Sequence, residues 1–98
     1  MALDTDLLDV LRGIIDPEIG INIVDLGLVY RAERTDEAID VAITMTTRAC
    51  PLGEMMLEEA RAALSRHFPT LLVTTSLVWE PPWTPAMMSA AGRESLAM

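Results

Sequence analysis

Residues 39–46 read IDVAITMT, an alternation with a period of two. This period predicts a β-strand whose side chains point to opposite faces of a sheet. One face would carry Ile39, Val41, Ile43 and Met45, and the other would carry Asp40, Ala42, Thr44 and Thr46. The strand is the clearest regular element of the chain, so the other elements are placed outward from it.

The segments on either side complete a small sheet. Residues 28–33 also alternate, and Thr35-Asp36-Glu37 is a plausible turn, so this pair of strands is expected to form an antiparallel hairpin. After the central strand, residues 51–67 carry apolar side chains at helical spacing, until Phe68-Pro69 ends the pattern. A third strand is predicted over residues 71–79, where Val, Leu and Thr are frequent.

The two ends of the chain supply further elements. An apolar stripe with a 3.6-residue period predicts a first helix that stops at Asp16-Pro17, and Asp4, Thr5 and Asp6 offer N-cap chemistry. Residues 18–27 are expected to form a structured loop and residues 80–85 a rigid, proline-braced one, followed by a short helix over 86–96. The stripe consists of Leu7, Leu8, Leu11, Ile14 and Ile15.

This order predicts an α+β fold of two layers. An N-terminal helix, a β-hairpin, a second helix and a third strand would build a small mixed three-stranded sheet, with the helices covering one face. No linker or repeat divides the 98 residues, so we expect one domain over residues 1–98.

Composition excludes several classes of function. Seven basic and 15 acidic residues give a net charge of −8, which repels nucleic-acid backbones and anionic membrane surfaces. No run of about 18 apolar residues occurs, and the acidic start is unlike a signal peptide, so a cytoplasmic protein is expected. The single cysteine, Cys50, excludes an intramolecular disulfide and a zinc ribbon or four-thiolate cluster within one chain.

Cys50 stands where the central strand leads into the second helix. If Pro51 is the first helical residue, Cys50 is the N-cap, where backbone N–H groups and the helix dipole lower a thiol pKa. Such a thiolate is a better nucleophile or metal ligand. Arg48 could add positive charge, whereas the Glu54 carboxylate would compete with the thiolate for the same N–H donors. A buried cysteine that acts as a small apolar residue is the alternative.

Other candidates are carboxylates and one tryptophan. Asp16 and Glu18 flank a proline and, with Asp25, could bind a cation, transfer protons or hydrogen-bond neighbouring N–H groups; turn-making is the structural alternative. His67 lies roughly 24 Å of helix from Cys50, so a cysteine–histidine pair within one chain is not expected. Trp83 could pack in the core or anchor a partner.

Four stretches together resemble the SufT/PaaD-like family of small iron–sulfur assembly proteins, also described as metal–sulfur cluster biosynthesis proteins. They are DPE at 16–18, NIVDLGLVY at 22–30, TMTTRACP at 44–51 and PPWTPAMMS at 81–89. The chain lacks the cysteine-bearing C-terminal extension of the PaaD branch.

The resemblance implies an assembly, carrier or targeting factor rather than a turnover enzyme. Cys50 would ligate iron or an iron–sulfur cluster transiently, Asp16, Glu18 and Asp25 would line or support the site, and Thr46 and Arg48 would flank it. The partners would be iron–sulfur client or scaffold proteins, and a homodimer could bring two Cys50 thiolates together. Two alternatives remain open: a thiol-dependent enzyme or persulfide carrier, and an interaction adaptor that uses Trp83.

Overall fold

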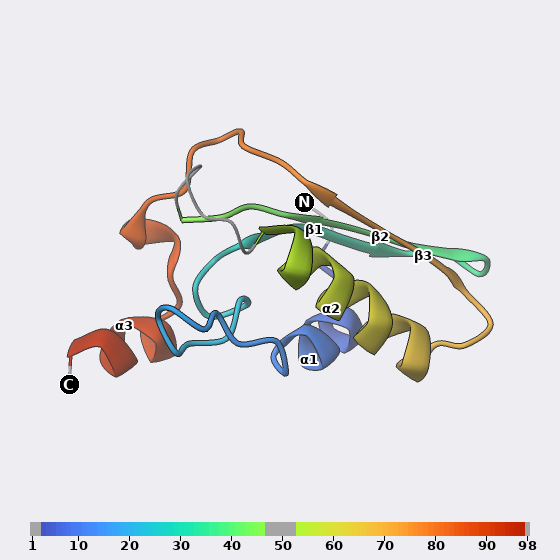
Figure 1. The fold of residues 1–98 in the computed structure, drawn as a ribbon, viewed down its shortest axis with the longest axis horizontal. Helices are drawn as coiled ribbons and strands as arrows, with labels where there is room; N and C mark the ends of the chain where they lie inside the picture. Colours follow the sequence, from blue (N-terminus) through green and yellow to red (C-terminus); the bar gives the residue numbers. More distant parts are fainter. Residues whose placement is uncertain (1–2, 47–52, 98) are drawn as a thin grey trace.

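The predicted α+β fold is confirmed. The structure, a computed structural model, describes residues 3–46 and 53–97. Its elements follow the predicted order (Figure 1). They are α1 (Thr5–Leu11), β1 (Val29–Arg34), β2 (Ala38–Ile43), α2 (Gly53–His67), β3 (Leu72–Leu77), the 3-10 turn η1 (Pro85–Met87) and α3 (Ala90–Ala97).

The sheet is mixed, with strand order β1-β2-β3. β1 and β2 pair antiparallel and form the hairpin that the sequence predicted. β3 pairs with β2 in parallel after the crossover through α2. Val41 of β2 lies opposite Ala32 on one side and Thr75 on the other. Helices α1 and α2 lie side by side on one face of this sheet, whereas none of the helices within residues 3–46 and 53–97 covers the other face (Figure 1).

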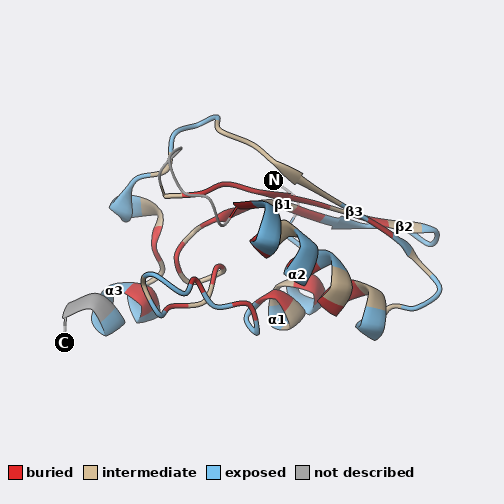
Figure 2. Cartoon of the chain, in the orientation of Figure 1, coloured by how far each residue is buried: buried red, intermediate tan, exposed pale blue. Residues whose placement is uncertain are grey.

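The core fills the space between the sheet and these helices. Figure 2 shows the buried positions gathered along the inner sides of α1 and α2, on β2 and in the loop that precedes β1. The largest fully buried side chains are Leu7, Leu11, Ile23, Leu26, Leu28, Ile39, Val41, Ile43, Thr44, Met56 and Leu64. The loop over residues 14–28 contributes three of these side chains, so it is part of the core rather than a free linker.

The first helix is shorter than its apolar stripe predicted. Asp4 caps it as expected, accepting the Asp6 N–H at 2.9 Å through Oδ1, but α1 ends at Leu11. The N–H of Ile14 donates to the Leu11 carbonyl at 3.0 Å, which turns the chain away from the helix. Ile14 stays buried while Ile15 is 47% exposed. The predicted helix was correct to Leu11 and wrong beyond it, because a tight turn follows Leu11; Ile14 is buried as its place in the stripe predicted, whereas Ile15 is not.

Strict alternation is also broken in β1. The register shifts between Val29 and Arg31, so that Val29 faces Ile43 and Arg31 faces Ala42, leaving Tyr30 as an extra residue. Such a bulge re-aims a side chain. The Tyr30 hydroxyl donates to the Pro81 carbonyl at 2.7 Å, across 51 residues of sequence.

The chain after β3 returns across the end of the sheet. We call residues 78–97 the C-terminal strap; in Figure 1 it passes back to the loop over residues 14–28, and α3 lies beside that loop. The predicted extended segment over 80–85 is present, and η1 begins at its end. The single helix predicted over 86–96 is instead η1 followed by α3, because Met88 is extended between them.

Candidate functional site

Cys50 and Arg48 lie outside the described residues, so the predicted N-cap thiolate remains a prediction. The elements on either side of it are described. β2 ends at Ile43, three residues before the end of the predicted strand, and residues 44–52 connect it to α2. Thr46, at the near side of this connection, is partly buried. At the other end of α2, His67 is exposed and belongs to a 15-residue helix, about 22 Å long.

Asp16 stabilises the turn in which it lies. Its side chain is only 2% exposed, and its Oδ1 accepts the Glu18 N–H at 2.9 Å. Its backbone N–H donates to Ile21, and its carbonyl accepts the N–H of Gly20, whose φ of +81° suits glycine. These bonds agree with the turn-making alternative for Asp16. Glu18 is exposed on the same turn.

Asp25 joins the loop to the C-terminal strap. One carboxylate oxygen, Oδ2, accepts the Asn22 Nδ2–H at 2.7 Å, and Oδ1 accepts the Ser89 hydroxyl at 2.9 Å. The Ser89 N–H also donates to the Asp25 carbonyl at 2.8 Å. The hydrogen bond from Asn22, and then that from Ser89, lower the pKa of Asp25, against the opposing effect of burial. Asp25 therefore holds its charge while it fixes the strap.

Trp83 is anchored within the chain. Its indole N–H donates to the Leu26 carbonyl at 2.7 Å, and its ring packs partly buried against the core. The interpretation of Trp83 as core packing agrees with these contacts, whereas its use by a partner stays a prediction.

Two glycines allow the C-terminal strap to approach the loop over residues 14–28 closely. A Cβ on Gly27, whose φ is +78°, would lie 2.2 Å from the Met87 carbonyl oxygen. A Cβ on Gly92 would lie 2.6 Å from the carbonyl oxygen of Asp25. Only glycine fits these distances, so backbone meets backbone at this junction.

The sequence did not single out Asn22, Ser89 or Tyr30 as functional positions. All three lie in the stretches that carry the family resemblance, yet Ser89 and its partner Asp25 are 64 residues apart. No local pattern pairs residues at that distance. The available signal was their place within these stretches, where Asn22 and Ser89 are polar residues among mostly apolar ones.

A second buried polar side chain is that of Thr44, which is 1% exposed. Burial raises the pKa of Tyr30, and the interaction of its hydroxyl with the Thr44 hydroxyl, which lowers that pKa, offsets this only in part. Among the described residues, the Thr44 Oγ1 is a buried side-chain oxygen with no hydrogen-bond partner of good geometry. Thr44 directly follows β2 and begins the segment that leads to Cys50.

Within residues 3–46 and 53–97, no group of three or more His, Cys, Asp or Glu side chains is arranged to hold a metal ion. Asp16 and Asp25 are engaged in separate hydrogen-bond sets. None of the helices described there is long and apolar enough to cross a membrane.

Known proteins share both the sequence and this fold. A family model described as iron–sulfur cluster assembly protein matches residues 4–75. The Staphylococcus aureus Fe-S protein maturation auxiliary factor SufT is 39% identical over 87 residues, covering 87% of this chain and 98% of that protein. Bacillus subtilis YitW, also an Fe-S protein maturation auxiliary factor, is 32% identical over 98 residues, covering 99% and 96%.

A solved structure agrees with the fold. The crystal structure of a domain of unknown function, DUF59, from Bacillus anthracis superposes with a TM-score of 0.90 at 31% identity. The match covers 96% of this chain and 91% of that one. The molecule is thus a small α+β protein of the class used in iron–sulfur protein maturation. The chain belongs to the iron–sulfur cluster assembly protein family, as the resemblance to SufT-like proteins predicted.

Proposed function

We propose that this protein is a carrier or targeting factor in iron–sulfur protein maturation, with Cys50 as the ligand of its cargo. The observation that carries the proposal is that the family match over residues 4–75 includes Cys50, the single thiol of the sequence. Iron or an iron–sulfur cluster is the cargo, and the thiolate would ligate it transiently. The working place would be the cytoplasm, where thiols stay reduced.

The other ligands would come from outside the chain. The part of the chain that the structure describes has no ready set of metal-ligating side chains, and Asp25 is occupied by Asn22 and Ser89. A second copy or a client or scaffold protein would therefore complete the coordination. One thiolate from each chain gives weak, reversible ligation, which suits a factor that must release its cargo.

A position at the N-terminus of α2 would favour the thiolate. Unpaired backbone N–H groups and the helix dipole stabilise negative charge there, which lowers a cysteine pKa. Arg48 and Thr46 would support this environment from the preceding segment. Asp16 and Glu18 would shape the neighbouring turn, so we assign them a supporting role and no direct ligation.

A thiol-dependent enzyme is disfavoured by the place of the single histidine. His67 is the last residue of α2, at the opposite end from the segment that carries Cys50. About 22 Å of helix separates the two ends, which is far beyond hydrogen-bond reach. An in-chain base of the usual kind is therefore missing from the proposed site.

Anaerobic reconstitution tests the proposal. Wild type, Cys50→Ser and Cys50→Ala would be incubated with ferrous iron and sulfide and compared by absorption and Mössbauer spectroscopy, with Ser65→Ala on α2 as a control. We expect a cluster or iron–thiolate signal in wild type and Ser65→Ala that is lost in both Cys50 variants. A signal of equal strength in Cys50→Ala, or none in wild type, would contradict ligation by Cys50 and favour the adaptor interpretation.

A further inference from the structure

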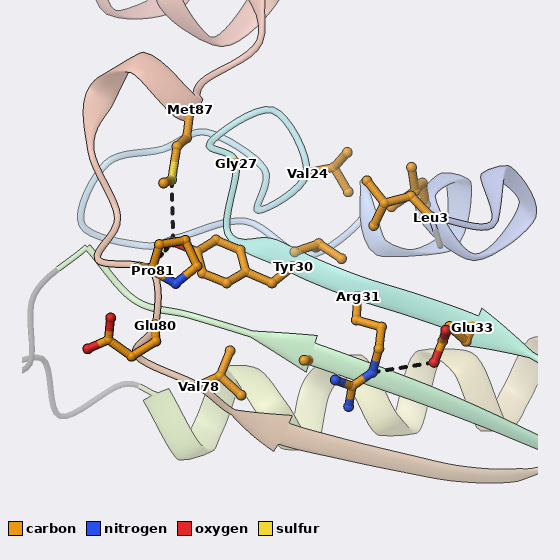
Figure 3. A pocket seen from close by; sticks show the side chains of 13 residues that line it. Leu3, Val24, Gly27, Tyr30, Arg31, Glu33, Val78, Glu80, Pro81 and Met87 are labelled. Carbon is orange, nitrogen blue, oxygen red and sulfur yellow. Dashed lines mark hydrogen bonds and ion pairs between the residues drawn. The ribbon is translucent and has the colours of Figure 1, made fainter. Parts of the chain in front are cut away.

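A groove lies beside β1, an edge strand of the sheet, and is lined by Leu8 of α1 as well as by the strand residues Arg31 and Ala42. Its volume is about 1020 Å³. Four segments far apart in the sequence build it: the N-terminal region, the loop before β1, the hairpin strands and the start of the strap (Figure 3). Among its lining residues are Leu3, Val24, Tyr30, Ala42, Val78 and Met87. We call it the sheet-face groove.

The middle of the sheet-face groove is apolar. In Figure 3, Val24 and Leu3 approach from the side of α1 and the loop, while Val78 stands on the opposite side. The Tyr30 ring lies between them, next to Pro81, and its hydroxyl is already hydrogen-bonded to the Pro81 carbonyl. The walls therefore offer aliphatic and aromatic surface, which binds apolar side chains by their removal from water.

The charges around the groove are predominantly negative. The charged side chains that line it within the described residues are Arg31, Glu33 and Glu80. Arg31 is neutralised by Asp40, whose Oδ2 lies 2.9 Å away, and approached by Glu33 at 3.5 Å. Glu33 and Glu80 stand at opposite ends of the view in Figure 3. Apolar walls thus lie between two carboxylates, in a chain of net charge −8.

We propose that the sheet-face groove binds an extended segment of a partner protein whose apolar side chains are flanked by Lys or Arg. This proposal deepens the proposed function, and rests on it, by giving the chemistry through which a client or scaffold protein would dock. Charge complementarity selects this occupant. An anionic small molecule would meet Glu33 and Glu80, and a second copy brings its own charge of −8.

The size of the groove agrees with a peptide segment. Pockets for small molecules span about 300–1,000 Å³, so the sheet-face groove, at about 1020 Å³, is slightly larger than that range. It is also bordered by strand β1 and by the extended start of the strap, so a chain lying along it would run beside both. Several consecutive side chains could therefore be accommodated, with basic groups near Glu33 and Glu80.

Two labelled peptides of opposite charge test the proposal. The probes are Gly-Lys-Leu-Val-Leu-Lys-Gly and Gly-Glu-Leu-Val-Leu-Glu-Gly, each with a fluorescent label, titrated with the full chain and followed by anisotropy and by amide NMR shifts. We expect the Lys probe to bind about tenfold more tightly, since two attractive exposed charge pairs replace two repulsive ones. Shift changes should concentrate at Tyr30, Ala42 and Val78.

A charge-matched pair of variants gives the control. Glu33→Gln with Glu80→Gln should remove most of the preference for the Lys probe, whereas Glu59→Gln with Glu94→Gln, exposed and outside the groove, should keep it. Equal binding of both probes, no binding of the Lys probe at millimolar concentration, shift changes elsewhere, or self-association through the groove would overturn the proposal. Neither iron nor sulfide enters this measurement, so its failure would leave ligation by Cys50 standing.

Discussion

Two regions of this molecule carry carboxylates in opposite settings. At the junction of the loop over 14–28 with the C-terminal strap, Asp25 accepts hydrogen bonds from Asn22 and Ser89, and glycines bring the backbones together. On the open sheet face, Asp40 and Arg31 form an ion pair whose side chains are 45% and 41% exposed. The same chemical group thus fixes the fold in one place and stays accessible to solvent in the other.

The difference lies in what surrounds each carboxylate. Asp25 is hydrogen-bonded to two side chains, and its own backbone carbonyl receives a further bond from the strap. Removing such a group leaves partly buried donors unsatisfied, which is costly. Water and salt screen the attraction between the charges of an exposed ion pair, so the pair contributes little to the free energy of unfolding. Acidic residues of the family motif can therefore be structural, while those of the open face are available for recognition.

The largest loss of stability is expected when a side chain is added where the C-terminal strap contacts the loop over residues 14–28. Gly27→Ala would place a Cβ 2.2 Å from the Met87 carbonyl oxygen at a φ of +78°. We expect a loss of at least about 2 kcal/mol of unfolding free energy, measured by urea denaturation, with release of the strap.

Gly20→Ala is the matched control. Its φ is +81°, yet nothing lies within 4 Å of the added Cβ, so only the backbone cost of about 1 kcal/mol should appear. Equal losses for the two variants would show that the junction is not tightly packed.

Asp25 should make stability depend on acidity. Because its pKa in the folded protein is lowered from 3.8, its contribution is present above that value and is lost as the pH falls through the folded pKa. Asp25→Asn should cost about 1–2 kcal/mol at pH 7. Thermal unfolding between pH 7 and pH 2.5 should show the gap from wild type narrowing below about pH 4.

Asp36→Asn, at an exposed position in the β1–β2 turn, provides the comparison for Asp25→Asn. It should follow the wild-type curve throughout the same pH range. If the Asp25→Asn gap were constant with pH, the carboxylate charge would not be what fixes the strap.

The smallest effect is expected on the open sheet face. Asp40→Asn removes the exposed pair with Arg31 and should change the unfolding free energy by less than about 0.5 kcal/mol. A loss above about 1 kcal/mol in urea denaturation would place this pair with the structural carboxylates and end the contrast between the two regions.

Periodicity predicted those parts of the fold that depend on neighbouring residues. The alternation of residues 39–46 located β2, and the apolar spacing after Cys50 located α2. Periodicity failed where contacts between residues distant in sequence determine the local structure. The end of α1 depends on how Ile14 and the loop enter the core, and the bulge at Tyr30 accompanies its contact with Pro81.

The sequence identified residues of the candidate site but did not determine what each of them does. Asp16, Glu18 and Asp25 were found because acids and a proline stand together, but Ser89 as the partner of Asp25 could not be foreseen. A hydrogen bond across 64 residues leaves no local trace in composition or spacing. Cys50 was selected by its place between a strand and a helix, and its role stays a prediction.

The central claim is that Cys50 handles the cargo while Asp25 maintains the fold. The most direct test is the activity of an iron–sulfur enzyme in cells whose own copy of this protein is replaced by wild type, Cys50→Ser or Asp25→Asn. We predict that Cys50→Ser accumulates with wild-type thermal stability but fails to support the enzyme. Asp25→Asn should support it in proportion to the amount of folded protein. Full enzyme activity with Cys50→Ser would contradict the account.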